Sequence, residues 1–252
     1  YGSNLDYIKE LVEYWRTEFD WRAQEKLINS FCHFKTDVNG LGIHFIHEKG
    51  KGPDPMPLVI THGWPGTFFE MHKVIPMLAD PASHGGDPAD AFDVVAPSMS
   101  GYGFSDAGQK VGLDIFAISD MWAKLMSDNL GYQRFAAQGG DWGARVTAKL
   151  GLSYGDKVIG IHTTSTTSPT PYLGEGSREL SEAEKEMLQQ RTQWLADEGG
   201  YSHIQSTKPQ TLSYGLNDSP AGLAAWIVEK YRKWSDCNGD VETRFTKDEL
   251  LT

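Results

Sequence analysis

The 252-residue sequence predicts an α/β fold with a mostly parallel β-sheet, preceded by a helical arm and followed by a helical lid. Residues 1–35 carry mainly helical periodicity. Between residues 36 and 163, short apolar runs of strand character alternate with helical segments. That order forms a parallel sheet with right-handed crossovers. Residues 164–252 return to helices with no strand between them. We therefore expect an arm, the first half of an α/β core and an incomplete lid region.

The composition indicates a large globular domain rather than a nucleic-acid or membrane protein. With 39% apolar and 12% aromatic residues, the chain can bury a substantial core. A net charge of -11 and a sequence pI of about 5.1 argue against the basic patches that nucleic acids and anionic membranes require. The sequence also contains no apolar run near the ~20 residues of a membrane-spanning helix.

Cysteine usage and the N-terminus bear on location. Cys32 and Cys237 lie far apart and match no metal or redox spacing. Two thiols in a chain of this length favour a reducing compartment, so the expected location is cytoplasmic. Tyr1-Gly2-Ser3-Asn4 resembles neither a signal peptide nor a natural start. An upstream membrane anchor or targeting segment therefore stays open.

The arm is predicted to form two helices. Asn4 or Ser3 can cap the first, and residues 20–29 form the second. The apolar residues at helical spacing in the first helix are Leu5, Ile8, Leu11, Val12, Trp15 and Phe19. So many aromatic side chains need a packing surface. We expect the arm to wrap against the domain that follows.

The sheet is predicted to begin with a hairpin over residues 34–47, because Asn39-Gly40 separates two alternating segments. His44 and His47 would lie on opposite faces of its second strand, so they are not a metal-binding pair. Further strands are expected at residues 92–97 and 157–163, and an amphipathic helix over residues 114–130.

A buried strand, Leu58 to Thr61, leads directly into His62-Gly63-Trp64-Pro65-Gly66 and then a helix at residues 67–75. Loops at the carboxyl end of parallel strands are where such sheets bind ligands. Pro65 restricts Trp64, and a cis bond there would aim the Trp64 N–H inward. The alternative is a Pro-Gly turn that binds nothing. We interpret His62, at the strand end, as a structural hydrogen-bonding residue rather than a base.

The chain is organised around the stretch from Arg134 to Leu150. A run of strand character passes through Gly139-Gly140-Asp141-Trp142-Gly143 into a helix. This is the context of the nucleophile elbow of α/β-hydrolases, with Asp141 where the familiar pattern has Ser. The glycines remove Cβ atoms that would clash where strand and helix pass closely. Alternatively, Asp141 only caps the helix of a glycine-rich turn.

The lid region is predicted to start with a linker over residues 164–176, rich in Thr, Ser, Pro and Gly. A charged helix follows at residues 179–194, with a capping box at Ser181 to Glu184. Residues 199–205 are expected to interrupt it, and Pro220 to Tyr231 to form another helix.

Taken together, these segments resemble the α/β-hydrolase-fold epoxide hydrolases, in particular their microsomal-type branch. The resemblance spans nearly the whole chain. It rests on the motifs His62-Gly63-Trp64-Pro65-Gly66, Ser100-Gly101-Tyr102-Gly103-Phe104-Ser105 and Gly139-Gly140-Asp141-Trp142-Gly143, with the arm (Tyr14-Trp15, Asp20-Trp21-Arg22), His44-Phe45-Ile46-His47, and the lid segments 201–205, 207–209 and 216–223.

The resemblance implies a cofactor-independent hydrolase of epoxide detoxification, with no metal. Asp141 would attack a small hydrophobic epoxide and form an alkyl-enzyme ester, which water hydrolyses to a vicinal diol. Tyr201 would donate to the epoxide oxygen, with Tyr214 as the weaker candidate. The N–H groups of Trp64 and Trp142 would form the oxyanion hole. The expected substrate pocket consists of His62, Trp64, Pro65 and Trp142.

The sequence departs from the family in one respect. The family's second lid tyrosine, its acidic partner and its water-activating His follow the lid, and none of the eight His residues lies there. We expect either a second polypeptide that completes the domain or a truncated chain. Alone, such a chain would expose unpaired sheet edge and apolar surface. Asp141 could be alkylated in it, but hydrolysis would stall.

Two other functions stay open at this point. A haloalkane dehalogenase also uses an Asp nucleophile followed by Trp on this fold, although the Trp64 loop, the arm and Tyr201 favour the epoxide hydrolase. A non-catalytic half-domain could instead bind hydrophobic ligands through its aromatic side chains. Homo-oligomerisation is also open.

Overall fold

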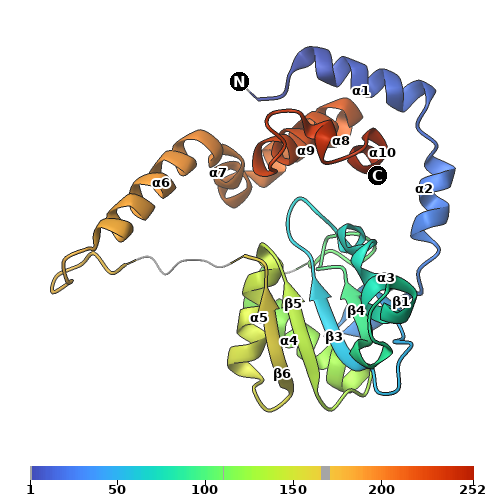
Figure 1. The fold of residues 1–252 in the computed structure, drawn as a ribbon. Coiled ribbons are helices and arrows are strands. Elements are labelled where there is room, and N and C mark those ends of the chain that lie inside the picture. The colour runs from blue at the N-terminus through green and yellow to red at the C-terminus, as the bar shows by residue number, and fades with distance from the viewer. Residues whose placement is uncertain (1, 110, 166–170) are drawn as a thin grey trace. The chain divides into compact units, whose positions relative to one another are not determined.

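The computed structural model describes residues 2–109, 111–165 and 171–252, in two compact units. The sheet unit comprises residues 22–167. The helical unit combines residues 1–21 with residues 168–252. Figure 1 labels the helices and strands of both units.

The sheet unit contains a six-stranded sheet in the order β1-β2-β4-β3-β5-β6. Its strands are β1 (His33–Val38), β2 (Leu41–Glu48), β3 (Met56–Thr61), β4 (Phe92–Pro97), β5 (Phe135–Gly139) and β6 (Val158–Thr163). The β4–β3, β3–β5 and β5–β6 pairs are parallel, whereas β2 is antiparallel to both β1 and β4. The predicted mostly parallel sheet is confirmed.

The hairpin of β1 and β2 is also confirmed. Its turn places Asn39 at φ 56° and Gly40 at φ 83°, the left-handed backbone that an Asn-Gly turn supplies. The register pairs Val38 with Leu41 directly at the turn. This register places Ile43 in one of the two cores and Ile46 in the other.

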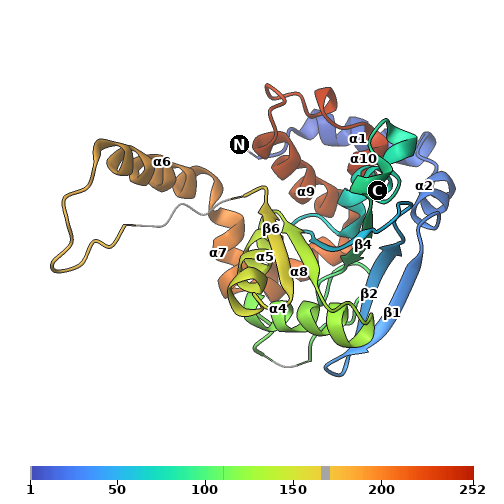
Figure 2. The same ribbon diagram turned by 60° about the horizontal axis from the view of Figure 1, so that its bottom comes forward.

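Helices cover both faces of the sheet. Figure 2 shows α4 and α5, which lie against one of these faces. Helix α4 (Ile115–Lys124), its π-helical continuation η4 (Leu125–Asn129) and α5 (Trp142–Ser153) pack on one face. Helix α2 (Trp21–Ile28), the 3-10 turn η1 (Phe68–Met71) and α3 (Val74–Ala79) contribute to the core on the other. The two cores include Trp122, Phe135 and Leu150 on the first face and Ile46, Ile60 and Ile75 on the second.

The helix predicted at residues 67–75 is wrong in its extent. The chain forms η1, capped by the Thr67 side chain, and α3 then begins at Val74. Pro76 explains the break, because proline is tolerated in the first turn of a helix but not in its interior. The loop that follows contains two further 3-10 turns, η2 (Pro81–His84) and η3 (Pro88–Asp90).

In the helical unit, α1 (Leu5–Thr17) packs on C-terminal segments. Leu11 is fully buried with Val228 and Val241, and the Tyr14 hydroxyl donates to Asp248 Oδ1 at 2.9 Å. The sequence predicts that the arm packs on the domain that follows it, and α2 does so through Ile28. The first helix of the arm instead forms a core with residues more than 200 positions away. Sequence periodicity identifies the apolar face of a helix but not the surface that covers it.

The remaining helices are α6 (Glu182–Glu198), α7 (Gly200–Thr207), α8 (Pro209–Asp218), α9 (Pro220–Trp234), the 3-10 turn η5 (Val241–Thr243) and α10 (Lys247–Leu251). The capping box at Ser181 and Glu184 is confirmed. The predicted interruption at residues 199–205 is confined to Gly199, because α7 restarts the helix at Gly200. Residues 166–170 of the predicted linker lie outside the described residues.

One edge of the sheet carries exposed apolar side chains. Strand β6 is the last strand in the sheet order. Its Ile159 and Ile161 are 42% and 49% exposed.

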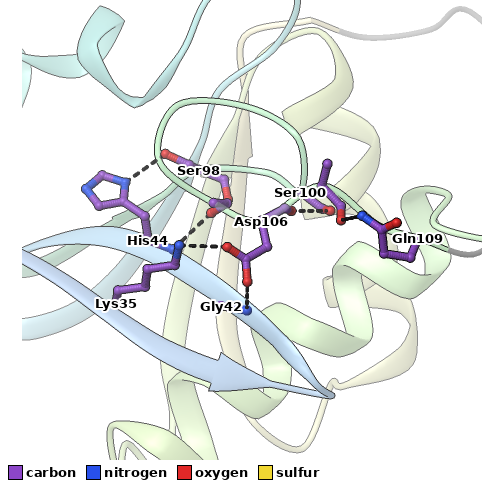
Figure 3. Close-up of polar contacts among 9 residues, drawn as sticks. Lys35, Gly42, His44, Ser98, Ser100, Asp106 and Gln109 are labelled. Atoms are coloured by element: carbon purple, nitrogen blue, oxygen red, sulfur yellow. Dashed lines mark hydrogen bonds and ion pairs between the residues drawn. The ribbon is translucent and has the colours of Figure 1, made fainter.

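The loop at the carboxyl end of β4, residues 98–109, is fastened to the β1–β2 hairpin (Figure 3). Lys35 Nζ donates to Asp106 Oδ1 at 2.7 Å, and the Gly42 N–H donates to Oδ2 at 2.9 Å. The carboxylate therefore bridges both strands of the hairpin. This contact places the loop beside the carboxyl end of the parallel strands.

His44 forms a second, buried connection between the same hairpin and loop. The His44 backbone N–H donates to Ser105 Oγ at 2.9 Å. In its side chain, the ring atom Nδ1 lies 2.9 Å from Ser98 Oγ (Figure 3). Its Nε2 lies 2.8 Å from His33 Nδ1. A neutral His44 can form both side-chain hydrogen bonds if the Ser98 hydroxyl donates to Nδ1 and the His44 Nε2–H donates to His33 Nδ1.

We expect His44 to make the fold sensitive to acid. Burial, and then the positive charges at His33 and Lys35, lower its pKa from 6.5 to about 4. The unfolded chain thus binds a proton between these pH values that the folded protein does not. Stability should be complete above about pH 6.5 and fall by up to about 3 kcal/mol as the pH drops to about 4.

Chemical denaturation midpoints between about pH 7 and pH 5 measure this effect. His44→Gln should flatten the pH dependence. His84→Gln, which alters an exposed histidine, should leave it unchanged. Equal pH slopes in the unaltered chain and His44→Gln would contradict the assignment.

Candidate active site

The predicted elbow is a sharp turn between β5 and α5. Asp141, at the cap position of α5, has φ 49° and ψ −120°. A positive φ is uncommon for a residue with a side chain and is held only where the surroundings fix it. Strand β5 ends at Gly139, and α5 starts at Trp142. The turn therefore presents one carboxylate at the carboxyl end of the parallel strands.

Close backbone approach explains the glycines around Asp141. A Cβ on Gly143 would lie 2.0 Å from the Thr61 carbonyl oxygen at the end of β3. A Cβ on Gly139 would lie 2.2 Å from the Gly143 carbonyl oxygen. Both distances are far below van der Waals contact, as we predicted from the sequence. The start of α5 therefore lies directly against the ends of two strands.

The Asp141 side chain does not act as a helix cap. It makes no capping hydrogen bond within the described helix α5. Its Oδ1 instead accepts the Trp64 N–H at 2.9 Å. Gly63 allows this approach, because a Cβ there would lie 2.4 Å from the Asp141 Cβ. The structure thus brings together the two sequence motifs that we had singled out separately.

The Trp64–Pro65 peptide bond is cis, in agreement with the sequence expectation. His62, one position before Gly63, is only 1% exposed. Its Nε2 accepts the Met99 N–H at 3.1 Å, and its Nδ1 lies 3.1 Å from the Gly63 carbonyl oxygen. Both ring nitrogens thus support neighbouring loops. We therefore keep His62 as a structural residue and leave it out of the proposed pocket.

Trp142 is the second residue predicted to donate an N–H to an oxyanion. It is the first residue of α5, where backbone N–H groups have no partner within the helix. Its side chain is 43% exposed, and its ring lies 4.8 Å from the Arg145 guanidinium. A donor in this position suits the proposed role, and the exposed indole is available to a ligand.

Glu70 is a neighbour of the site that sequence reasoning missed. Its Oε1 accepts the Gly63 N–H at 3.3 Å. Desolvation, opposed by that hydrogen bond and assisted by the charge of Asp141, raises its pKa to about 7. The sequence does contain one feature that could have pointed to it: Glu70 is a single acidic residue among Phe68, Phe69 and Met71, directly after the loop at residues 62–66. Adjacent amides of one loop therefore bind two carboxylates, Glu70 and Asp141.

A cavity of about 680 Å³ lies beside the elbow in the sheet unit. Gly140 and Thr164 border it. Its other lining side chains are mainly apolar and come from β3, β5, β6 and the η1–α3 segment, including Leu58, Ile60, Met71, Ala136 and Ile161. Its polar lining side chains include Glu70, Gln138 and His162.

Both tyrosine candidates belong to the helical unit. Tyr201 is half-buried on α7, and its ring centroid lies 5.0 Å from that of Trp234. Tyr214, on α8, is 69% exposed. Tyr201 is therefore held among other side chains, whereas Tyr214 projects from the surface of the unit.

Two findings for residues 2–109, 111–165 and 171–252 concern metal ions and membranes. No group of three or more His, Cys, Asp or Glu side chains that could hold a metal ion occurs among those residues. Over the same residues, no helix has both the length and the apolar character needed to span a bilayer.

Sequence comparison identifies two family matches. Residues 1–71 match the family described as epoxide hydrolase N terminus, and residues 56–217 match the alpha/beta hydrolase fold family. A putative epoxide hydrolase from Stigmatella aurantiaca is 43% identical over 99% of this chain and 56% of its own length. Epoxide hydrolase 1 from Sus scrofa is 41% identical over 100% of this chain and 60% of its own length.

A solved structure agrees with these relatives. The juvenile hormone epoxide hydrolase from the silkworm Bombyx mori matches with a TM-score of 0.81 and 32% identity, over 100% of this chain and 60% of that chain. The chain thus spans 56–60% of the length of these relatives. The match to residues 56–217 covers well over half of the sequence. The chain belongs to the alpha/beta hydrolase fold family.

Proposed function

We propose that this chain carries the alkylating half of an epoxide hydrolase that acts on small hydrophobic epoxides. One observation carries the proposal: Asp141 sits on a strained elbow with its carboxylate hydrogen-bonded to the Trp64 N–H rather than to its own helix. The similarity to epoxide hydrolases over 99–100% of the chain supports this choice of reaction.

In the proposed first step, an Asp141 oxygen attacks an epoxide carbon. A carbon–oxygen bond of the strained ring breaks as the new ester bond forms, and the electron pair passes to the epoxide oxygen. Tyr201 donates its proton to that oxygen. The product is an alkyl-enzyme ester that carries a neighbouring hydroxyl group.

In the proposed second step, water attacks the ester carbonyl and a tetrahedral oxyanion forms. The Trp64 N–H already lies 2.9 Å from Asp141 Oδ1, so it can stabilise that charge without rearrangement. The Trp142 N–H is the proposed second donor. Collapse of the oxyanion restores Asp141 and releases a vicinal diol.

The other functions considered receive less support. The Stigmatella aurantiaca and Sus scrofa relatives, which match 99–100% of this chain, carry the names putative epoxide hydrolase and epoxide hydrolase 1. The bond between Asp141 and the Trp64 N–H also gives the carboxylate a geometry that a purely non-catalytic binding domain does not need.

Intact mass before and after incubation with a simple aryl epoxide tests the proposal. We expect the protein mass to rise by one substrate mass, because alkylation needs only the residues described above. A persistent increase means that the ester forms and is not hydrolysed. Diol formed over many turnovers means that the chain, with any co-purified polypeptide, completes the reaction. Neither adduct nor diol would contradict the proposed function.

A further inference from the structure

The helical unit contains a buried cation beside the proposed acid. Lys230 lies on α9, and only 7% of its side chain is exposed. Its Nζ lies 5.1 Å from the centroid of the Tyr201 ring. The same atom lies 5.5 Å from the Trp226 ring and 5.6 Å from the Trp234 ring. Three aromatic faces thus converge on one ammonium group.

Two helices set this arrangement. Trp226, Lys230 and Trp234 follow one another at four-residue spacing on α9 and therefore share one face of it. Tyr201 comes from α7, and its ring packs on that of Trp234. The aromatic rings hold the ammonium over the Tyr201 ring.

Burying a lysine is costly unless its charge is compensated. Lys230 forms an ion pair with its neighbour Glu229, whose side chain is 22% exposed. By comparison, Lys233 on the same helix forms an ion pair with Glu198 of α6 at 3.5 Å, and its side chain is largely exposed to solvent. An apolar residue could fill the space between three rings without this cost. The charge itself therefore calls for an explanation.

We propose that Lys230 is a positioning residue for Tyr201, holding its ring and stabilising the negative charge that the ring acquires when the hydroxyl gives up its proton. The inference rests on the proposed function. As Asp141 forms the ester bond, the epoxide oxygen receives the electron pair and takes the Tyr201 proton. The tyrosinate regains a proton from the water that later hydrolyses the ester, so that epoxide and water yield diol.

The physical basis is the preference of a nearby positive charge for the ionised form of an acid. Tyrosinate spreads its charge from the oxygen into the ring, and the ammonium lies over that ring. The flanking indoles lower the local dielectric constant, which strengthens the attraction. Tyr214, 69% exposed on α8, lacks such shielding from solvent.

The test uses the full chain and three lysine variants. Lys230→Met removes the charge at similar length, and Lys230→Arg keeps it. Lys233→Met removes an exposed charge from the same helix as a control. The first readout is the rate of alkyl-enzyme formation with an aryl epoxide, followed by intact mass across neutral and alkaline pH. The second is the pH midpoint of tyrosinate absorbance, with the Tyr201 signal identified by Tyr201→Phe.

We expect Lys230→Met to slow adduct formation about tenfold and to move the Tyr201 midpoint to higher pH. Lys230→Arg should largely restore both, and Lys233→Met should change neither. If Lys230→Met folds poorly by circular dichroism, Lys230→Gln replaces it. Unchanged rate and midpoint on loss of the charge would overturn the inference. So would equal losses in Lys230→Met and Lys230→Arg, which indicate packing alone.

These outcomes separate the inference from the proposed function. If the unaltered chain forms no adduct, the proposed alkylation is contradicted. If Tyr201→Phe forms adduct at the normal rate, the proposed role of Tyr201 as proton donor is contradicted. The absorbance titration needs no reaction, so it then decides alone whether Lys230 favours the ionised Tyr201.

Discussion

Asp141→Asn should abolish alkyl-enzyme formation, with a rate loss of at least about a thousandfold. The substitution keeps the shape of the side chain and its oxygen acceptor for the Trp64 N–H, so the elbow should stay intact. An amide is a far weaker nucleophile than a carboxylate and cannot form the ester directly. Intact mass after incubation with an aryl epoxide measures the loss.

Asp156→Asn is a matched control, because Asp156 is an exposed acid in the turn between α5 and β6. It should form adduct at the normal rate. Normal adduct formation in Asp141→Asn would show that another side chain is alkylated, and peptide mapping would identify it. That result would return Asp141 to a structural role in the βα turn.

Local sequence rules predicted the parts of the site that depend on neighbouring residues. The Asn39-Gly40 hairpin, the cis bond before Pro65 and the elbow at Asp141 each follow from backbone preferences within a few positions. The clash-relieving role of Gly143 could also be anticipated, because an elbow brings a strand and a helix together. Each of these features is determined by residues within a few positions of it in the sequence.

Features that depend on distant packing could not be predicted in this way. Glu70 lies seven positions after Gly63, and only a folded loop brings their atoms to 3.3 Å. Lys230 and Tyr201 stand on separate helices, so neither sequence segment indicates a cation over a ring. The partners of α1 lie at the other end of the chain for the same reason. Helical periodicity identifies an apolar face without identifying its partner.

Gly143→Ala should have the second large effect, through backbone geometry rather than chemistry. The added Cβ would lie 2.0 Å from the Thr61 carbonyl oxygen and 2.9 Å from that of His62. Both are backbone atoms at the end of a buried strand, so neither can move away without a large cost in free energy. We expect the free energy of unfolding to fall by at least about 3 kcal/mol, or α5 to shift. Denaturation midpoints measure the first outcome.

Gly160→Ala is the control, since a Cβ on Gly160 in β6 would meet nothing within 4 Å. It should leave stability nearly unchanged. The informative comparison is adduct formation by Gly143→Ala at a temperature where it stays folded. A shift of α5 would pull Asp141 away from the Trp64 N–H, so alkylation should be lost although the carboxylate is present. Normal stability and normal alkylation together would mean that β3 and α5 do not approach this closely in solution.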